Sequence, residues 1–313
     1  MSKVTTFKHL LLYDRKGLKI AVFSYIVKSG VLNRMSDEKF IKLLYYMYTG
    51  KRINLDDPQL LNEKMQWLKL YNRNPLYTNL VDKAKVKEIV AEELGIEYVV
   101  PTIGLYKSFD DINFDVLPEK FVMKCTHDSG STIICENKDK LNKDKVKKKL
   151  KKKLNRNLFY WGREYPYKNV TPQIIIEKYI NSTPDKTLVD YKFFCYGGKP
   201  IYFMYSIGEA ERHAINHKFN MNLESIDYLF KEVSAIDVGS INLPSNINEM
   251  IKIVERLCMN FPMVRIDLYN IAGIIYFGEY TFSPNNGFIN MVSDEFSQKL
   301  ASLIDVDKIK QSL

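Results

Sequence analysis

Residues 265–288 read RIDLYNIAGIIYFGEYTFSPNNGF, an apolar stretch that only a few charged side chains interrupt. An apolar strand ends in Arg265-Ile266-Asp267, and a turn follows at residues 270–273. A second strand then runs to Glu279, so the pattern predicts a β-hairpin.

The predicted hairpin brings Asp267 and Glu279 within reach of each other, beside a basic side chain and in a segment suited to burial. A buried charge without a partner is costly, so two carboxylates on adjacent core strands need a compensating group. The usual group is a hard divalent cation, most commonly Mg²⁺ bound to phosphates. The alternative is an ordinary hairpin whose acidic residues end the strands in solvent.

The length of 313 residues suggests two domains or one large α/β unit, and 46% apolar residues provide for a sizeable core. His213 and His217 are four residues apart, either on one helical face or as an incidental pair. The cysteines lie far apart without a CxxC pair, which argues for a reducing compartment and against a disulfide scaffold or zinc site. They are Cys125, Cys135, Cys195 and Cys258.

No segment approaches the roughly 18 apolar residues of a membrane helix. The best run is IAVFSYIV at residues 20–27, which lysines flank and no signal peptide precedes. We therefore expect a cytoplasmic protein. Its formal charge of +9 allows peripheral association with the inner face of the membrane.

The charge is concentrated in KDKVKKKLKKKLNRN, residues 143–157, where Val146, Leu150 and Leu154 form one thin apolar stripe. This spacing predicts a helix with a strongly basic outer face. It is either a solvated helix or a surface for anionic lipid, nucleotide or acidic polymer. Basic and aromatic residues do not interleave here, so a nucleic-acid partner is not expected.

The remaining pattern mixes helices and strands, with residues 1–80 mainly helical. Amphipathic spacing predicts helices over residues 40–48, 59–71, 80–94 and 246–260, and in the tail after residue 294. Runs of apolar residues predict strands over residues 99–106, 121–125, 132–135 and 172–180, and a hairpin over 190–208 that turns at Gly197-Gly198.

A polar loop, THDSGS, follows the strand that carries Lys124. Such a loop can cover phosphates with backbone N–H groups, and Gly130 permits the close approach. The lysine adds a point charge. A plain hairpin with a Ser/Gly turn would have the same pattern, and the segment is not a Walker loop because no GK[ST] follows.

An Ile-rich strand ends in Glu177-Lys178-Tyr179-Ile180 and can offer backbone groups and a carboxylate to an adenine amino group. Asp185, a few residues on, could hold a ribose hydroxyl; a plain strand terminus is the alternative. Asp190-Tyr191-Lys192 then opens the next strand, and Arg265 follows later. Adenine contact, phosphate cover, cations and metal ligands thus come in a consistent order along the chain.

In these stretches the chain resembles the TupA-like ATP-grasp family, found with genes for cell-surface polysaccharides. The resemblance covers about residues 35–300 and is carried by residues 61–87, 117–134, 174–180, 190–200 and 261–288. It implies an α+β ATP-grasp fold, with two α+β subdomains that sandwich ATP and a reduced helical N-terminal region. The implied division is residues 1–80, 81–180 with the phosphate loop, and 181–313 with the metal site.

The resemblance also implies roles for single residues. Lys83 matches a helix-start lysine that reaches the ATP phosphates, and Lys124 matches the strand lysine before the flexible phosphate loop. Gly130 and Ser131 match the loop that closes over the γ-phosphate. The other matches are Glu177 and Ile180 at the adenine, Asp185 at the ribose, Arg265 and Lys192 as catalytic cations, and Asp267 and Glu279 as magnesium ligands. Thr281 stands where the family's third ligand is asparagine, which leaves the second Mg²⁺ open.

The implied function is an ATP- and Mg²⁺-dependent carboxylate–amine ligase that acts through an acyl phosphate in capsule or polysaccharide biosynthesis. Its expected substrates are an anionic sugar acid or acidic polymer and an amine, for example an amino acid. Two alternatives stay open: a glycosyltransferase of polysaccharide biosynthesis and a non-catalytic nucleotide-binding scaffold.

Overall fold

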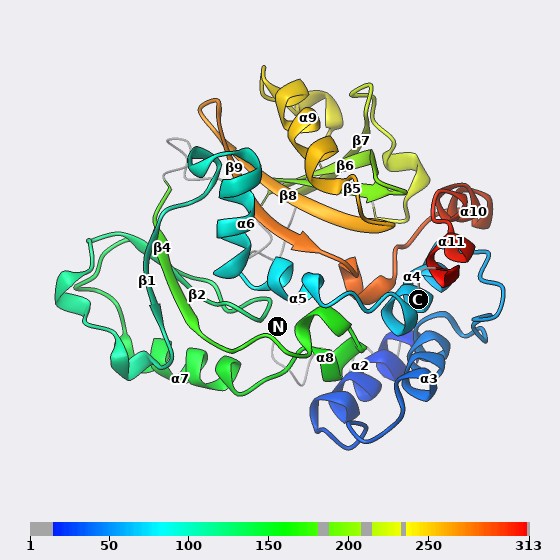
Figure 1. Cartoon of the computed structure of the whole chain (residues 1–313), viewed down its shortest axis with the longest axis horizontal. Coiled ribbons are helices and arrows are strands. Elements are labelled where there is room, and N and C mark those ends of the chain that lie inside the picture. The colour runs from blue at the N-terminus through cyan, green and yellow to red at the C-terminus, as the bar shows by residue number, and fades with distance from the viewer. Residues whose placement is uncertain (1–14, 181–187, 208–214, 233–235, 312–313) are drawn as a thin grey trace.

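A computed structural model describes residues 15–180, 188–207, 215–232 and 236–311 and places the strands in two antiparallel sheets (Figure 1). The four-stranded sheet has the order β1-β4-β2-β3, and the five-stranded sheet has the order β7-β6-β5-β8-β9. The small sheet comprises β1 (Thr102–Tyr106), β2 (Phe121–Cys125), β3 (Ile133–Cys135) and β4 (Ile174–Lys178). The large sheet comprises β5 (Val189–Tyr196), β6 (Lys199–Ile207), β7 (Ile215–Asn220), β8 (Met263–Ile271) and β9 (Ile274–Thr281).

The small sheet has one apolar face and one face with charged residues, because side chains alternate along each strand. Phe121, Met123 and Ile176 are fully buried on the first face, against Val146 and Leu150 of helix α7 (Lys143–Leu154). The predicted basic helix and its apolar stripe are therefore confirmed. The opposite face carries Val122 paired with Glu177, and Lys124 paired with Ile175.

The large sheet aligns the predicted site residues across three neighbouring strands. Lys192 on β5 pairs with Asp267 on β8, and Asp267 pairs with Glu279 on β9. Arg265 pairs with Thr281 two positions away and so lies on the same face. The opposite face is apolar and packs against helix α9 (Ile247–Cys258), whose inner side is buried.

A β-bulge at Gly278 interrupts the hairpin between β8 and β9. Asp267 pairs with Glu279, while the next residue, Leu268, pairs with Phe277, so Gly278 is the extra residue. A Cβ atom at Gly278 would lie 2.9 Å from the carbonyl oxygen of Asp267, which explains why glycine occupies the bulge. The predicted hairpin is confirmed, and the bulge is an addition to it.

The N-terminal and C-terminal helices share one core, which also includes Phe194, Tyr202 and Met263 of the large sheet. Figure 1 shows these helices below and to the right of the sheets. They are α2 (Arg15–Lys28), α3 (Asp37–Thr49), α4 (Leu61–Tyr71), α10 (Asp294–Ser302) and α11 (Val306–Gln311). The division at residues 80 and 180 stays a prediction.

The single helix predicted over residues 80–94 is wrong, because the chain breaks into α5 (Leu76–Val81) and α6 (Lys85–Leu94). The Asp82 carboxylate accepts hydrogen bonds from the backbone N–H groups of Ala84, at 2.9 Å, and Lys85, at 3.4 Å. This local cap competes with a continuous helix. It leaves Lys83 between the two helices.

Other predictions had mixed outcomes. The helix predicted from residue 59 begins at Leu61, because the Glu63 carboxylate accepts from the backbone N–H groups of Gln59 and Leu60.

His217 lies on β7, so the helical pairing is wrong, and His213 is outside the described residues. All four cysteines are free and buried. Among the described residues, no helix combines the length and apolar character that crossing a membrane requires.

Candidate active site

Arg265 joins the two predicted metal-binding carboxylates. Its Nε and Nη2 atoms each lie 2.7 Å from an oxygen of Asp267, and Nη2 also lies 3.0 Å from Oε1 of Glu279. The Thr281 hydroxyl donates to the same Oε1 atom at 3.2 Å. Asp267 is buried, so this pairing provides the charge compensation that its burial requires.

Two lysines complete this charged cluster. Lys192 Nζ lies 3.9 Å from Oδ2 of Asp267, and Lys83 Nζ lies 3.6 Å from Oε2 of Glu279. Burial alone would raise the pKa of Glu279, but Lys83, Arg265 and Lys192 outweigh it and hold that pKa at about 2. Burial raises the pKa of Asp267 above its usual value, although Arg265 and Lys192 oppose the change.

The donor atoms fit a hard divalent cation, because Asp267, Glu279 and Thr281 offer only oxygen. Within the described ranges, no group of three or more His, Cys, Asp and Glu side chains gathers as a metal cage. A two-carboxylate site of this kind suits Mg²⁺, which usually keeps several waters and binds substrate phosphates as its other ligands.

The loop between β2 and β3 is tied to this cluster through Lys83. The Lys83 backbone N–H donates to the carbonyl of Thr126 at 3.0 Å, and its Nζ donates to the carbonyl of Asp128 at 2.8 Å. Gly130 has a φ of 75°, a conformation that favours glycine. The predicted phosphate loop and the carboxylate hairpin therefore lie on opposite sides of one lysine.

Ser131 is buried, and its hydroxyl is used inside the loop. It donates to Oδ1 of Asp128 at 2.5 Å and accepts from the backbone N–H of Cys125 at 2.8 Å. The second carboxylate oxygen of Asp128 lies 3.1 Å from Nζ of Lys153 on α7. Ser131 thus holds the shape of the loop, and its contact with phosphate stays a prediction.

Glu177 forms a buried ion-pair network. Its Oε2 atom lies 2.6 Å from Lys124 Nζ, and its Oε1 atom pairs with Lys87 Nζ. The two lysines outweigh the effect of burial and hold the pKa of Glu177 below its usual value. Because both oxygens are engaged, we expect this carboxylate to orient Lys124. Contact between the carboxylate and adenine stays a prediction.

Lys87 is a residue that the sequence reasoning missed. It follows Lys83 by four residues, and its ammonium also donates to the Val100 carbonyl at 2.7 Å and to Oγ1 of Thr102 at 3.0 Å. Within the helix predicted over residues 80–94, the spacing from Lys83 to Lys87 was the available signal, since residues four apart on a helix share a face.

A cleft of about 120 Å³ lies between the charged face of the small sheet, α6 and β9. Its charged end contains Lys83, Lys87, Lys124 and Glu177. Apolar side chains form most of the remaining wall, beside Thr132, Lys178, Tyr269 and Gly278: Val86, Val99, Val100, Val122, Ile134, Ile180, Leu188 and Phe277. Ile180 is thus where an apolar ring could be held, whereas Asp185 falls outside the described residues.

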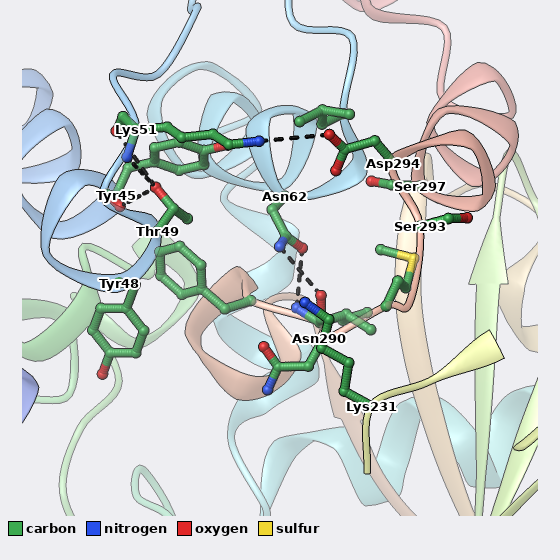
Figure 2. Close-up of a pocket in the computed structure, with 14 residues that line it drawn as sticks. Tyr45, Tyr48, Thr49, Lys51, Asn62, Lys231, Asn290, Ser293, Asp294 and Ser297 are labelled. Carbon is green, nitrogen blue, oxygen red and sulfur yellow. Dashed lines mark hydrogen bonds and ion pairs between the residues drawn. The ribbon is translucent and has the colours of Figure 1, made fainter. Parts of the chain in front are cut away.

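A second pocket, of about 200 Å³, lies among α3, α4 and the segment before α10 (Figure 2). Its polar groups largely pair with one another. Lys51 reaches Asp294 at 3.5 Å, and the Asn62 amide exchanges two hydrogen bonds with the backbone of Ile289. None of the predicted site residues lines it, so the cleft is the stronger candidate.

The profile of a family described as TupA-like ATPgrasp matches residues 63–305. A D-alanine–D-alanine ligase from Bacillus anthracis complexed with ATP is 18% identical, with a TM-score of 0.43, over 80% of this chain and 69% of that one.

Two further solved structures are similar at lower identity. An L-amino acid ligase from Bacillus licheniformis is 11% identical, with a TM-score of 0.46, over 81% of this chain and 57% of that one. The ATP-grasp ligase PsnB, complexed with a precursor variant, Mg and ADP, is 10% identical, with a TM-score of 0.41, over 78% of this chain and 66% of that one. No curated protein matches the sequence.

Proposed function

The chain belongs to the TupA-like ATP-grasp family, and we therefore propose that it is an ATP-dependent enzyme that ligates an amine to a carboxylate through an acyl phosphate. The observation that carries the proposal is the position of Lys83, which contacts both the loop after β2 and Glu279 of the hairpin. A triphosphate between these segments would meet cations on both sides.

In the proposed complex, the adenine lies in the apolar part of the cleft beside Ile180, and its phosphates extend toward Lys83 and Lys124. The loop with Gly130 and Ser131 covers the γ-phosphate. Asp267 and Glu279, with Thr281, hold Mg²⁺. When bound, Mg²⁺ neutralises phosphate charge and favours transfer of the γ-phosphoryl group.

Arg265 and Lys192 face the transferring phosphate in this proposal. A carboxylate oxygen of the substrate attacks the γ-phosphorus, the bond to the bridging oxygen breaks, and ADP leaves. The amine nitrogen then attacks the acyl carbon, and phosphate departs with the electrons of the C–O bond. Catalysis of this kind is chiefly positioning and charge neutralisation.

We propose a sugar acid or an acidic surface polymer as the carboxylate substrate, in capsule or polysaccharide biosynthesis. The formal charge of +9 supports an anionic substrate, since a basic surface attracts polyanions. We also propose that the protein is cytoplasmic, and the same charge supports its association with the inner face of the membrane.

The test uses hydroxylamine, a small nucleophile that captures acyl phosphates as hydroxamates. The protein is incubated with ATP, Mg²⁺, hydroxylamine and a panel of uronic acids and acidic oligosaccharides. We expect hydroxamate and ADP to form together for one class of acid, and neither product with Asp267→Ala or Glu279→Ala. ADP formation at the same rate with and without every acid would contradict the proposal. Stabilisation of the protein by a UDP-sugar instead of ATP would also contradict it.

A further inference from the structure

A third pocket lies beside the loop after β2, among α2, α3, α8 (Phe159–Gly162) and the 3₁₀ turn Pro284–Gly287. Its volume of about 390 Å³ is in the range of small-molecule sites. Its polar lining includes Ser129, Glu164 and Asn286. Its apolar lining consists of Phe23, Val27, Leu44, Tyr48, Leu158 and Trp161.

The Glu164 carboxylate has no protein partner in this pocket: within the described chain, neither a hydrogen bond nor an ion pair reaches it. Cations lie in its neighbourhood. Lys69 and Arg265 act on it electrostatically, and Lys28 lines the same pocket. Burial raises the pKa of Glu164 above its usual value, against the opposing charges of Lys69 and Arg265. A polar group in a pocket wall without a protein partner is available to a ligand.

The cations near Glu164 are already used elsewhere. Lys69 Nζ donates to Oδ1 of Asn286 at 2.6 Å and to Oε1 of Gln66 at 2.9 Å. Lys28 Nζ lies 5.5 Å from the centre of the Trp161 ring. Arg265 holds the two carboxylates of the hairpin. None of them neutralises Glu164 by contact, which leaves room for a cationic ligand.

The 3₁₀ turn Pro284–Gly287 packs closely against α8. Asn285 and Asn286 both adopt a left-handed conformation, with φ values of 52° and 58°. Gly162 makes space for this turn, because a Cβ atom there would lie 2.0 Å from Oδ1 of Asn286. Asparagine adopts this conformation more readily than other non-glycine residues, so the sequence of the turn suits its backbone.

The pocket also lies next to the proposed chemistry. Ser129, which lines the pocket, precedes Gly130 in the predicted phosphate loop. The charge of Arg265 acts on Glu164, and Arg265 contacts both hairpin carboxylates. An amine that attacks an acyl phosphate must approach from a site adjoining the transferred phosphate.

We propose that this pocket binds the amine substrate as its ammonium ion, with Glu164 contacting the nitrogen and accepting a proton from it. The inference rests on the proposed ligase function. Transfer of one proton to Glu164 leaves a neutral amine. Its lone pair forms the C–N bond, the C–O bond to phosphate breaks, and the second nitrogen proton leaves with the phosphate.

The walls define the class of amine. Phe23, Val27 and Leu44 form an apolar surface, and Glu164 is the one carboxylate in the described lining of the pocket. The pocket therefore fits a primary amine with a single positive charge and an apolar body. A polyamine would leave its further charges without partners against an apolar wall.

The test compares two probes of the same shape, 2-phenylethylamine and 2-phenylethanol, by fluorescence of Trp161. Trp67, the other tryptophan, is buried in the core, so Trp161→Phe identifies the signal of the pocket. We expect the wild-type protein at pH 8 to bind the ammonium probe about tenfold more tightly than the alcohol. The preference should disappear in Glu164→Gln and persist in the control Glu255→Gln, an exposed position on α9.

Equal affinity for both probes in the wild-type protein would overturn the inference, and so would a preference that survives Glu164→Gln. Hydroxamate formation separates this result from the ligase proposal, because hydroxylamine does not need an ammonium site. If the wild-type protein prefers the ammonium probe but forms no hydroxamate, the proposal for the pocket stands and the ligase proposal fails. Equal loss of hydroxamate and amide formation in Glu164→Gln would assign Glu164 a structural role and overturn the inference.

Discussion

The ammonium group of Lys83 lies 3.6 Å from Oε2 of Glu279, although 196 residues separate the two in sequence. The same ammonium donates to the carbonyl of Asp128 in the loop after β2. One side chain thus contacts both segments proposed to enclose the ATP phosphates, and it comes from the short break between α5 and α6.

Lys83→Met keeps the length of the side chain and removes its charge. We expect acid-dependent ADP formation to fall by about 10²-fold or more, because a cation aimed at transferring phosphate is lost. The control is Lys85→Met, since Lys85 is exposed and bonds the Asn79 side chain at the surface. Equal rates for both variants would remove Lys83 from the proposed mechanism.

Asp267→Asn should weaken the dependence of nucleotide binding on Mg²⁺, because a neutral amide is a poorer ligand for a hard cation. Calorimetry with a non-hydrolysable ATP analogue, with and without Mg²⁺, measures this dependence. Asp307→Asn, at an exposed position on α11, serves as the control. A Mg²⁺ dependence that Asp267→Asn leaves intact would place the metal elsewhere.

Glu279 should contribute to acid stability. Its pKa is about 2 in the folded protein, below the roughly 4.3 of an unfolded chain. The ionised form therefore stabilises the fold above the unfolded pKa, and this contribution is lost as the pH falls from about 4.3 to 2. Urea unfolding of Glu279→Gln should show a flatter decline over this range. An unchanged slope would mean that the three cations do not act on this carboxylate.

Glu177→Ala should destabilise the protein by about 3–5 kcal/mol, because it leaves Lys87 and Lys124 buried without their carboxylate. Denaturant unfolding gives the free energy. Glu119→Ala changes an exposed glutamate in the same region and should cost less than about 0.5 kcal/mol. A small effect for Glu177→Ala would mean that the two lysines find other partners.

Arg163→Lys should also be destabilising, by about 2–4 kcal/mol. The buried Arg163 guanidinium donates to three backbone carbonyls between α2 and α3, pairs with Asp37 and lies 4.4 Å from the centre of the Phe40 ring. A lysine cannot reproduce the planar fork. Arg256→Lys, in an exposed pair with Glu93, should cost less than about 1 kcal/mol.

The sequence predicts well what local patterning controls. Two apolar runs on either side of a turn at residues 270–273 predict the hairpin, and the apolar stripe at Val146 and Leu150 predicts α7. Pattern is less informative at Asp82, where one side-chain cap divides a segment with continuous helical periodicity.

Such local patterns do not predict contacts between segments that are distant in the sequence. The pairing of Glu177 with Lys87 depends on the packing of α6 against the small sheet, and no local feature of either residue indicates it. No sequence pattern singles out Glu164. The charge of Arg265 acts on it only in the folded chain, where the segment after α8 comes near β8. The ion pair with Arg265 was likewise not expected for carboxylates assigned to a metal.

The bulge at Gly278 makes the proposed metal site depend on the residue at this one position. Phe277 enters the core two positions before Glu279, which faces Asp267, and the extra residue of the bulge is what allows both. Losing Gly278 altogether would leave regular alternation, with Glu279 still opposite Asp267. A larger side chain at this position would meet the carbonyl oxygen of Asp267 and displace the backbone that carries the carboxylate pair. Among related sequences, the acidic pair should therefore tolerate a gap at this position better than a bulky residue.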